Sequence, residues 1–370
     1  MEKVLGLLDL HSDRDLGALT QKRCIASTSF LGRYAFMDFA LSNFANSNID
    51  EVGILVRDHL RSLIQHLGSG HAFNGNTKLG SITLLYDEPY SHNLGYNHDV
   101  NNLLENKWLL ERSNAKTVVI SVSSIIAKID YRDYIAKHHA SGNKISMIYA
   151  PIKNARNHFI DRDVLSIEDG IVKSIKSNRG TEDYADISIS SVIVDKDYLC
   201  EMINQARDTS AFFSLRDIIT NNIVKQEKIT ALPFEGYVTY FDSLSSYLTQ
   251  SLELLKPEIC SNLFTDLWPI YTKTYDTPPT IYGKNAKVSN SFIANGAKID
   301  GTVTNSIIGR NVKIRKGARI NNSIILTDCE VGEDCNLDYV IVDKQAKIIF
   351  IKELIGTSSD PVFIKREDIV

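Results

Sequence analysis

Three side chains that can bind anions, those of Arg57, Arg61 and His66, lie at or near helical spacing in this sequence. A helix that begins with Arg57-Asp58-His59 would carry them on one side. A guanidinium can pair bidentately with a phosphate or carboxylate, which makes an anion or effector site one interpretation. The other interpretation is a solvated helix face. The spacing names Arg57 and Arg61 as candidate contacts and leaves both interpretations open.

Histidine and cysteine, which are frequent in catalytic and metal sites, show no such pattern. All nine histidines precede residue 160, and the isolated His11, His92 and His98 are typical of surface or loop positions. The five cysteines are odd in number, are scattered and form no C-x-x-C pair: Cys24, Cys200, Cys260, Cys329 and Cys335. This usage predicts reduced thiols in the cytoplasm and neither disulfides nor a zinc site.

The bulk composition excludes several classes of protein. The chain has 370 residues, is 43% hydrophobic and has a formal net charge of -4. It is long enough for two domains, and the absence of a basic block argues against a nucleic-acid partner. No apolar run reaches the length of a membrane span, and the first residues lack the pattern of a signal peptide. We therefore expect a cytoplasmic protein without a membrane partner.

The first part of the chain alternates strand-like and helix-like segments. Continuous apolar runs predict strands at 4–8, 52–56, 117–122 and 144–149, and amphipathic patterns predict helices at 100–112, 131–140 and 244–255. Buried strands that alternate with helices indicate an α/β domain with a mostly parallel sheet, covered on both faces.

After Ile281 a short repeat replaces this alternation. Aliphatic residues begin successive six-residue units at Ile293, Ile299, Ile308, Ile314, Ile320, Val331 and Leu337. Six residues form one flat face of a triangular coil whose aliphatic side chains stack inside, whereas a β-sandwich would show a period of two. A proline-containing connector precedes the repeat. The predicted domains are 1–255 and 281–370, joined by a linker at 256–280.

Three stretches of the sequence resemble the ADP-glucose pyrophosphorylase (glucose-1-phosphate adenylyltransferase) family. They are the L-T-Q-K-R of Leu19–Arg23, the stretch from Gly32 to Asn43, and Leu267–Thr272 with Pro278-Pro279. The resemblance covers nearly the whole chain. It implies a nucleotidyltransferase (Rossmann-like) domain, followed by a left-handed parallel β-helix of hexapeptide repeats. The reaction it implies makes ADP-glucose from ATP and glucose 1-phosphate.

Such a reaction needs backbone donors and cations for a triphosphate, and carboxylates that hold Mg²⁺. The family's opening loop is rich in glycine and ends in an arginine, but here no glycine precedes Gly17 and Asp15 takes the place of the arginine. Arg14 is the remaining cation for an unusual loop. Ile25 replaces a family lysine, and only Gly95 and Val100 remain of a nucleotide-contacting stretch.

Further losses follow when the resemblance is carried along the chain. Ser124 takes the place of the metal-binding aspartate, and a neutral hydroxyl cannot replace an anionic ligand of Mg²⁺. Ser177 and Asn178 replace the glutamate and lysine of the sugar-phosphate motif. Tyr240 takes the place of another carboxylate, although Asp242 lies two residues on and would share its face in a strand. No catalytic residue is therefore intact.

These losses predict a non-catalytic, regulatory-type subunit in glycogen synthesis. Its partner would be a catalytic paralogue in a hetero-tetramer, with Mg²⁺ only in that partner and a homo-oligomer when the chain is alone. Arg33 takes a lysine's place in a stretch that the family associates with activators, so an effector or subunit contact is expected there. The alternatives are an active enzyme with a rebuilt site and a stand-alone sugar-nucleotide sensor. A hexapeptide acyltransferase is disfavoured, because no histidine follows Ile281.

Overall fold

The computed structural model describes residues 3–73, 80–86, 97–210 and 212–370. Packing divides the chain into two compact units, Met1–Asp13 with Phe39–Tyr240 and Arg14–Asp38 with Phe241–Val370. Each unit joins stretches that are far apart in the sequence. The units therefore differ from the sequence-based boundaries at 255 and 281, which mark changes of pattern along the chain. His92 and Gly95 lie outside the described residues.

The first unit is built on a sheet that is nine-stranded within the described residues. The four predicted strands correspond to β1 (Val4–Asp9), β4 (Glu51–Leu55), β6 (Thr117–Val122) and β8 (Ile145–Ile152). The order across the sheet is β5 (Ser81–Leu85), β4, β1, β6, β11 (Ala185–Asp195), β8, β12 (Ile229–Pro233), β10 (Ile171–Ser177) and β9 (Asp163–Glu168).

Two of the nine described strands, β11 and β10, run against the others in this sheet. Strands β5, β4, β1 and β6 are parallel, and so are β8 and β12. Strand β11 runs antiparallel to both β6 and β8, and β10 runs antiparallel to β12 and β9. The expected mostly parallel sheet is confirmed, because seven of the nine described strands run the same way and only β11 and β10 are reversed. An apolar run shows that a strand is covered on both faces, and this is compatible with either direction.

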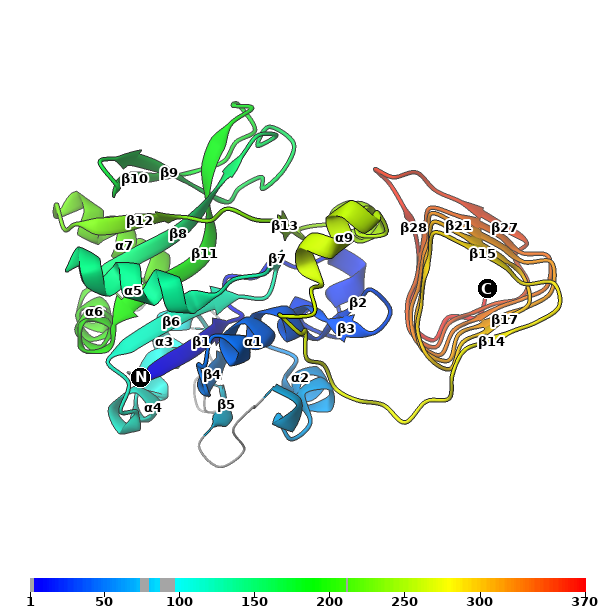
Figure 1. Ribbon diagram of the computed structural model, residues 1–370, viewed down its shortest axis with the longest axis horizontal. Coiled ribbons are helices and arrows are strands. Elements are labelled where there is room, and N and C mark those ends of the chain that lie inside the picture. The colour runs from blue at the N-terminus through cyan, green and yellow to red at the C-terminus, as the bar shows by residue number, and fades with distance from the viewer. Residues whose placement is uncertain (1–2, 74–79, 87–96, 211) are drawn as a thin grey trace. The chain divides into compact units, whose positions relative to one another are not determined.

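Different helices cover the two faces of the sheet (Figure 1). On one face, α3 (Asp99–Glu105), α6 (Lys196–Thr209) and α7 (Leu215–Val224) share an apolar cluster with Leu5 and Leu7 of β1. On the other face, a Cβ on Gly6 would lie 3.2 Å from the ring of Phe44 in α1 (Phe36–Asn46). The Phe44 ring lies 5.6 Å from that of Tyr131, the first residue of α5 (Tyr131–Ser141). Alternation along β1 sends odd and even residues to opposite layers.

The predicted helix at 100–112 is two short helices, α3 and α4 (Trp108–Arg112), and the one at 131–140 is α5. A further short helix, α2, spans Leu60–Leu67. A small two-stranded sheet pairs β7 (Ile125–Ala127) with β13 (Val238–Tyr240). Among the described helices, none combines the length and apolar character needed to cross a bilayer.

In the second unit, residues 281–370 form the left-handed parallel β-helix, which Figure 1 shows as nested triangular coils. One sheet holds β14 (Ile281–Tyr282), β17 (Lys298–Ile299), β20 (Lys313–Ile314), β23 (Glu330–Val331) and β26 (Lys347–Ile348). The second holds β15 (Lys287–Ser289), β18 (Thr302–Thr304), β21 (Arg319–Asn321), β24 (Asn336–Asp338) and β27 (Glu353–Ile355). The third holds β16 (Phe292–Ile293), β19 (Ile307–Ile308), β22 (Ile324–Ile325), β25 (Val340–Val342) and β28 (Val362–Ile364).

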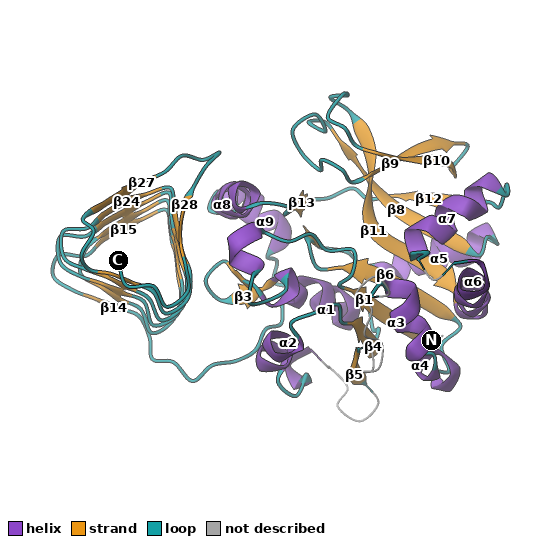
Figure 2. Cartoon of the chain, turned by 180° about the vertical axis from the view of Figure 1, so that it is seen from behind, coloured by secondary structure: helices purple, strands orange, loops and turns teal. Residues whose placement is uncertain are grey.

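Six of the seven predicted repeat residues fill the interior of these coils, and Ile293 is partly buried against them. Ile299, Ile308, Ile314, Ile320, Val331 and Leu337 are all between 0% and 2% exposed. The short strands lie on the three sides of the triangle, with loops at the corners (Figure 2). The hexapeptide period therefore predicted side chains of the solenoid core.

The third sheet of the β-helix is buried on both sides. Ile307, Ile324 and Ile341 precede the inward-facing residues of their coils, yet they are at most 1% exposed. The hairpin of β2 (Ser29–Phe30) and β3 (Tyr34–Ala35) covers this sheet closely. A Cβ on Gly32, in the turn of that hairpin, would lie only 2.8 Å from the carbonyl oxygen of Ile308. Glycine is therefore required for the approach.

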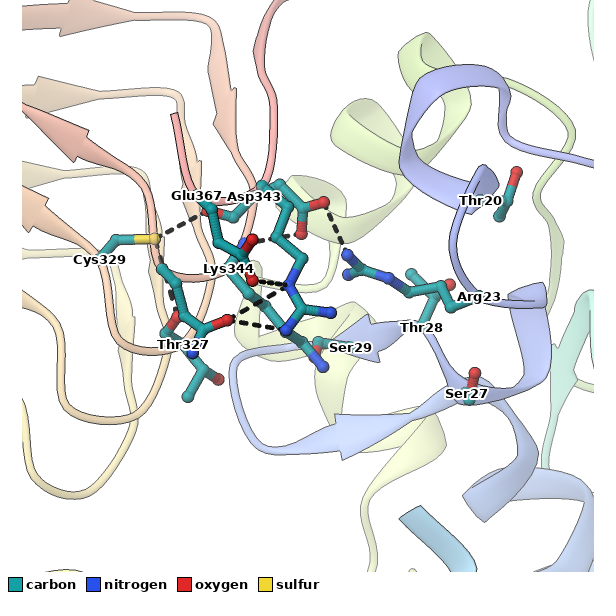
Figure 3. Close-up of polar contacts among 12 residues, drawn as sticks. Thr20, Arg23, Ser27, Thr28, Ser29, Thr327, Cys329, Asp343, Lys344 and Glu367 are labelled. Atoms are coloured by element: carbon teal, nitrogen blue, oxygen red, sulfur yellow. Dashed lines mark hydrogen bonds and ion pairs between the residues drawn. The ribbon is translucent and has the colours of Figure 1, made fainter. Parts of the chain in front are cut away.

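A buried ion pair fastens the segment 14–38 to the last coils. Arg23 Nη2 donates to Asp343 Oδ2 at 2.6 Å, and the two side chains are 5% and 4% exposed. Figure 3 shows Arg23 pointing toward Asp343, with Lys344 on the same coil. Burial, together with the charge of Arg23, lowers the pKa of Lys344 to about 8. A paired charge is tolerated in such a place, whereas an unpaired one is costly.

Two helices complete the second unit. Helix α8 (Leu244–Glu253) corresponds to the predicted helix at 244–255, and its Tyr247 hydroxyl donates to the Ser29 carbonyl oxygen at 2.7 Å. The predicted connector at 256–280 begins with α9 (Pro257–Leu263), and only its later part is extended. Pro257 lies in the first turn of α9, where its missing N–H costs no helical hydrogen bond.

Candidate functional site

A cavity of about 340 Å³ lies in the first unit, at the carboxyl ends of β1 and β6. Ligands of α/β proteins bind in this position, outside the strand ends. Its apolar lining includes Ile120, Val122, Met147 and Val192. Its charged lining is mixed, with carboxylates from Asp9, Asp99, Asp161 and Asp163 and guanidinium groups from Arg162 and Arg216.

The loop after β1 uses its amides inside the protein. The His11 N–H donates to Asp9 Oδ1 at 2.9 Å, and the Leu10 N–H donates to the Leu55 carbonyl oxygen at 3.2 Å. The Ser12 hydroxyl donates to the other oxygen of Asp9 at 2.5 Å. An anion nest requires successive N–H groups aimed outward, and these amides are already engaged.

Burial sets the charge of the groups at the end of β1. Asp9 is 3% exposed, and burial followed by the charge of Asp99 raises its pKa to about 7. Burial lowers the pKa of His11 to about 4, so its ring is neutral near pH 7. Asp99 accepts from the N–H groups of Val100 at 2.7 Å and Leu215 at 3.1 Å, which ties α3 to the start of α7. His11 therefore offers a triphosphate no positive charge.

The two arginines of the cavity are engaged by protein groups. Arg216 donates through Nε to both oxygens of Asp163, at 2.8 and 2.9 Å. Arg162 donates to the Ser190 hydroxyl and to the Ser12 carbonyl oxygen, and its guanidinium lies 4.7 Å from the ring centroid of Tyr240. Sequence reasoning missed both arginines, and the only local signal was the alternating charge of Asp161-Arg162-Asp163.

Ser124 lies in the connection between β6 and β7, where it meets the loop after β1. Asp13, 6% exposed, accepts from the Ser124 N–H at 2.9 Å through Oδ1 and from the Ser123 hydroxyl through Oδ2. Burial raises the pKa of the Asp13 carboxyl, and the donors from Ser123 and Ser124 oppose that rise. Ser124 itself is 0% exposed.

The other replaced residues have structural roles. The Asn178 amide, 5% exposed, donates to the carbonyl oxygens of Ala155 at 2.8 Å and His158 at 3.0 Å, which closes that loop. Ser177 is the last residue of β10. Tyr240 is 5% exposed and stacks on Phe159 with ring centroids 5.7 Å apart.

Asp15, Ile25 and Asp242 belong to the second unit, whereas Ser124, Ser177, Asn178 and Tyr240 belong to the first. Asp15 is exposed. Ile25 is 2% exposed and serves as a core residue of its unit. Asp242, the carboxylate of the alternative register, accepts from the Ser243 hydroxyl at 3.0 Å in front of α8.

These residues do not fit a catalytic Mg²⁺. Within the described part of the chain, no three His, Cys, Asp or Glu side chains gather as a metal site. Ser124 contributes a hydroxyl where an anionic oxygen is needed. The one carboxylate beside it, that of Asp13, accepts hydrogen bonds from Ser123 and Ser124.

The three candidate arginines divide between the units. Arg57 precedes α2, which begins at Leu60, so Arg57 and Arg61 do not share a helix. Arg57 Nη1 donates to the Asp13 carbonyl oxygen at 3.2 Å, and Arg61 is exposed on α2. Arg33, in the second unit, lines a small cavity of about 80 Å³ together with Lys273, Tyr275 and Arg310. The sequence had not associated Arg33 with those two cations.

Known protein families match two separate parts of the chain. Residues 15–161 match the nucleotidyl transferase family, and residues 279–360 match the GlmU-like C-terminal hexapeptide family. The chain is 29% identical to the glycogen biosynthesis protein GlgD of Bacillus subtilis (strain 168), over 98% of this chain and 96% of that protein. It is 30% identical to a glucose-1-phosphate adenylyltransferase of Clostridium botulinum (strain Alaska E43 / Type E3), over 84% of this chain and 81% of that enzyme.

A similar protein from Fervidobacterium nodosum, also named glucose-1-phosphate adenylyltransferase, is 29% identical over 92% of this chain and 83% of its own length. The matches extend through both the nucleotidyltransferase part and the hexapeptide part, so they do not rest on the repeats alone. The family resemblance drawn from the sequence motifs is confirmed. The chain belongs to the glucose-1-phosphate adenylyltransferase family.

Proposed function

We propose that this chain is a non-catalytic, regulatory subunit of a cytoplasmic glucose-1-phosphate adenylyltransferase that makes ADP-glucose for glycogen synthesis. The observation that carries the proposal is the contact of Asp13 with Ser123 and Ser124. At the place where the resemblance calls for a metal-binding aspartate, a serine donates its N–H to a carboxylate of the loop that should receive the triphosphate. That arrangement engages the donors at this place within the protein and supplies no carboxylate at residue 124 for Mg²⁺.

The charges around the first cavity support the same proposal. Arg216 is held by Asp163, and Arg162 is held by a hydroxyl and a carbonyl oxygen. A triphosphate would have to displace these partners and would lie near the carboxylates of Asp9 and Asp99. Preorganised donors supply much of the catalysis in phosphoryl transfer, and here they are engaged elsewhere. We infer that Mg²⁺ and turnover belong to a catalytic paralogue in a hetero-tetramer.

A regulatory role draws on the second unit. Arg33 shares its cavity with Lys273 and Arg310, and the Arg310 guanidinium lies 4.2 Å from the ring centroid of Tyr275. Guanidinium groups held over an aromatic ring are well placed to receive a phosphate or carboxylate. We infer that an anionic effector or an acidic residue of a partner subunit binds there. Arg57 and Arg61 remain weaker candidates for the same role.

The decisive experiment compares three preparations: this chain, an intact paralogue, and the two purified together. ADP-glucose formation from ATP, glucose 1-phosphate and Mg²⁺ is measured for each, with light scattering for the assembly state. We expect background activity and a homo-oligomer from this chain alone, and an active hetero-tetramer whose KM or effector response differs from that of the paralogue. Turnover by the partner-free chain that a mutation in this chain abolishes would refute the proposal.

A second candidate function, a stand-alone sugar-nucleotide sensor, is favoured by the persistence of the cavity of about 340 Å³. Its volume lies at the lower end of the roughly 300–1,000 Å³ that is usual for ligand sites. Equilibrium dialysis with ADP-glucose separates the two candidates. Saturable binding by the isolated chain, without complex formation with a paralogue, would favour the sensor.

A further inference from the structure

A further cavity of the first unit, of about 430 Å³, lies at the opposite edge of the sheet from the cavity at the end of β1. We call it the edge cavity. Lys116 and Lys144 line it where β6 and β8 begin, and Asp195 lines it where the antiparallel β11 ends. Asp197 and Glu201 line it from helix α6. Its volume falls within the roughly 300–1,000 Å³ that is usual for ligand sites.

The edge cavity brings side chains of opposite charge together without pairing them. Within the described part of the chain, neither of its lysines forms an ion pair with Asp197 or Glu201. Lys144 Nζ lies instead 4.4 Å from the ring centroid of Tyr198. Asp197 and Glu201 are four residues apart on α6, a spacing at which like charges repel. A ligand that carries charges of both signs would give each set of side chains a partner.

Hydrogen bonds fix the walls of the edge cavity. Tyr198 is 9% exposed, and its hydroxyl donates to the Glu227 carboxylate and accepts from Asn222 Nδ2 at 3.1 Å. Thr117, also in the lining, is 1% exposed, and its hydroxyl oxygen lies 2.9 Å from His139 Nε2. These walls are set before a ligand arrives, which limits the conformational entropy lost on binding.

We propose that the edge cavity binds a free amino acid with a cationic side chain. The two lysines receive its α-carboxylate, and the carboxylates of Asp195, Asp197 and Glu201 receive its two cationic groups. The lining holds three carboxylates and two ammonium groups, so a ligand with one carboxylate and two cations balances its charge. Hydrogen bonds between such charged groups are stronger than those between neutral ones. The inference goes beyond the proposed function, because it requires neither a partner subunit nor a nucleotide.

The test is isothermal titration calorimetry of the full chain with L-arginine and two analogues at equal ionic strength. Agmatine lacks the carboxylate, and Nα-acetyl-L-arginine lacks the α-ammonium group. We expect saturable binding of L-arginine and a Kd raised about 10-fold or more for each analogue, as one lost charged hydrogen bond predicts. L-glutamate, whose net charge is opposite, should bind more weakly than either. Equal Kd values for L-arginine and agmatine, or no saturable binding of L-arginine, would overturn the proposal.

Four variants at exposed positions locate the binding site. Glu201→Gln should raise the Kd of L-arginine about 10-fold, and Lys144→Gln should do the same while leaving the Kd of agmatine unchanged. Lys137→Gln is the matched control, because Lys137 Nζ also lies over a tyrosine ring, 5.5 Å from the centroid of Tyr134. Asp208→Asn, near the end of α6, controls for the loss of a carboxylate. If neither Glu201→Gln nor Lys144→Gln weakens L-arginine binding, the site lies elsewhere and the proposal is wrong.

Discussion

Two cavities of this protein differ in the balance of the charged side chains that line them. In the cavity at the end of β1, Arg216 is held by Asp163, and Asp9 and Asp99 bring further negative charge. In the cavity beside Arg33, the described lining consists of three cations with Thr274, Tyr275, Thr277 and Asn295, without a carboxylate. The two cavities therefore differ in the carboxyl groups that accompany the cations, and not in the presence of cations.

The second cavity also shows how closely its cations are placed. Burial and the charge of Arg33 lower the pKa of Arg310. Neighbouring cations that disfavour one another are relieved by a bound anion. The first cavity has no excess positive charge for an anion to relieve, because four carboxyl groups line it beside two arginines. This contrast underlies the two proposals, a first cavity without turnover and a second cavity that binds an anionic effector.

The largest expected effect concerns catalysis at the first cavity. Ser124→Asp should not produce ADP-glucose formation, because the loop after β1 would still present Asp13. Losing one preorganised donor typically costs about 100- to 1,000-fold in rate, and several are missing here. The new carboxylate would also meet that of Asp13 in a buried place, so the Tm should fall. Measurable turnover of the single variant in a pyrophosphate-release assay would contradict the proposed lack of catalysis at the first cavity.

The next effect tests the scaffold that carries Arg33. Arg23→Ala or Asp343→Ala leaves a buried charge unpaired, so urea unfolding should show a loss of about 3–5 kcal/mol. The double variant Arg23→Met with Asp343→Leu should recover much of the lost unfolding free energy, because neither partner is then left as an unpaired buried charge. Arg315→Ala is the matched control, since its ion pair with Glu330 is at the surface. That variant should lose no more than about 1 kcal/mol. Equal losses at the two pairs would contradict the role of burial.

A smaller effect is expected at the second cavity itself. Arg33→Ala and Arg310→Ala should weaken activation of the hetero-oligomer by an anionic effector, by roughly 10-fold in half-saturating concentration, as expected for one lost charged hydrogen bond. Lys284→Ala, at an exposed position of the first coil, is the control. The activation curves are measured at fixed substrate, with circular dichroism to verify folding. Unchanged curves for the Arg33, Arg57 and Arg61 variants would place the effector elsewhere.

A further effect is a dependence of stability on pH. The folded pKa of Asp9, about 7, lies above its ordinary value of 3.8. The folded state therefore holds a proton that the unfolded state has lost, and this group makes the protein less stable as the pH rises from about 4 to 7. Asp9→Asn removes that term, so its Tm relative to the wild type should be higher at pH 8 than at pH 5. Asp15→Asn, at an exposed position, controls for the chemical change. A difference that is flat with pH would show that Asp9 does not titrate in this range.

Local pattern was sufficient for much of the fold. Ile299, Ile314 and Val331 follow a six-residue period that each coil repeats with its neighbours, so no distant contact is needed to recognise the solenoid. The apolar runs of β1 and β6 likewise indicated buried strands. The same patterns did not show that β11 runs antiparallel, since burial on both faces is independent of direction. They also did not show that helix 100–112 divides at residues 106–107.

The pairing of the charged groups in these sites could be determined only from the folded structure. Motif positions marked Ser124 and Asp15 as unsuited to catalysis, but Asp13 and Ser124 are 111 residues apart, and Arg23 and Asp343 are 320 apart. No local property of either sequence stretch indicates these partners. Hydrogen bonds and ion pairs between distant residues form only after the sheet and the coils have brought their side chains within about 3 Å. The types of side chain available were therefore readable from the chain, whereas their pairing, and with it their charge, came from packing.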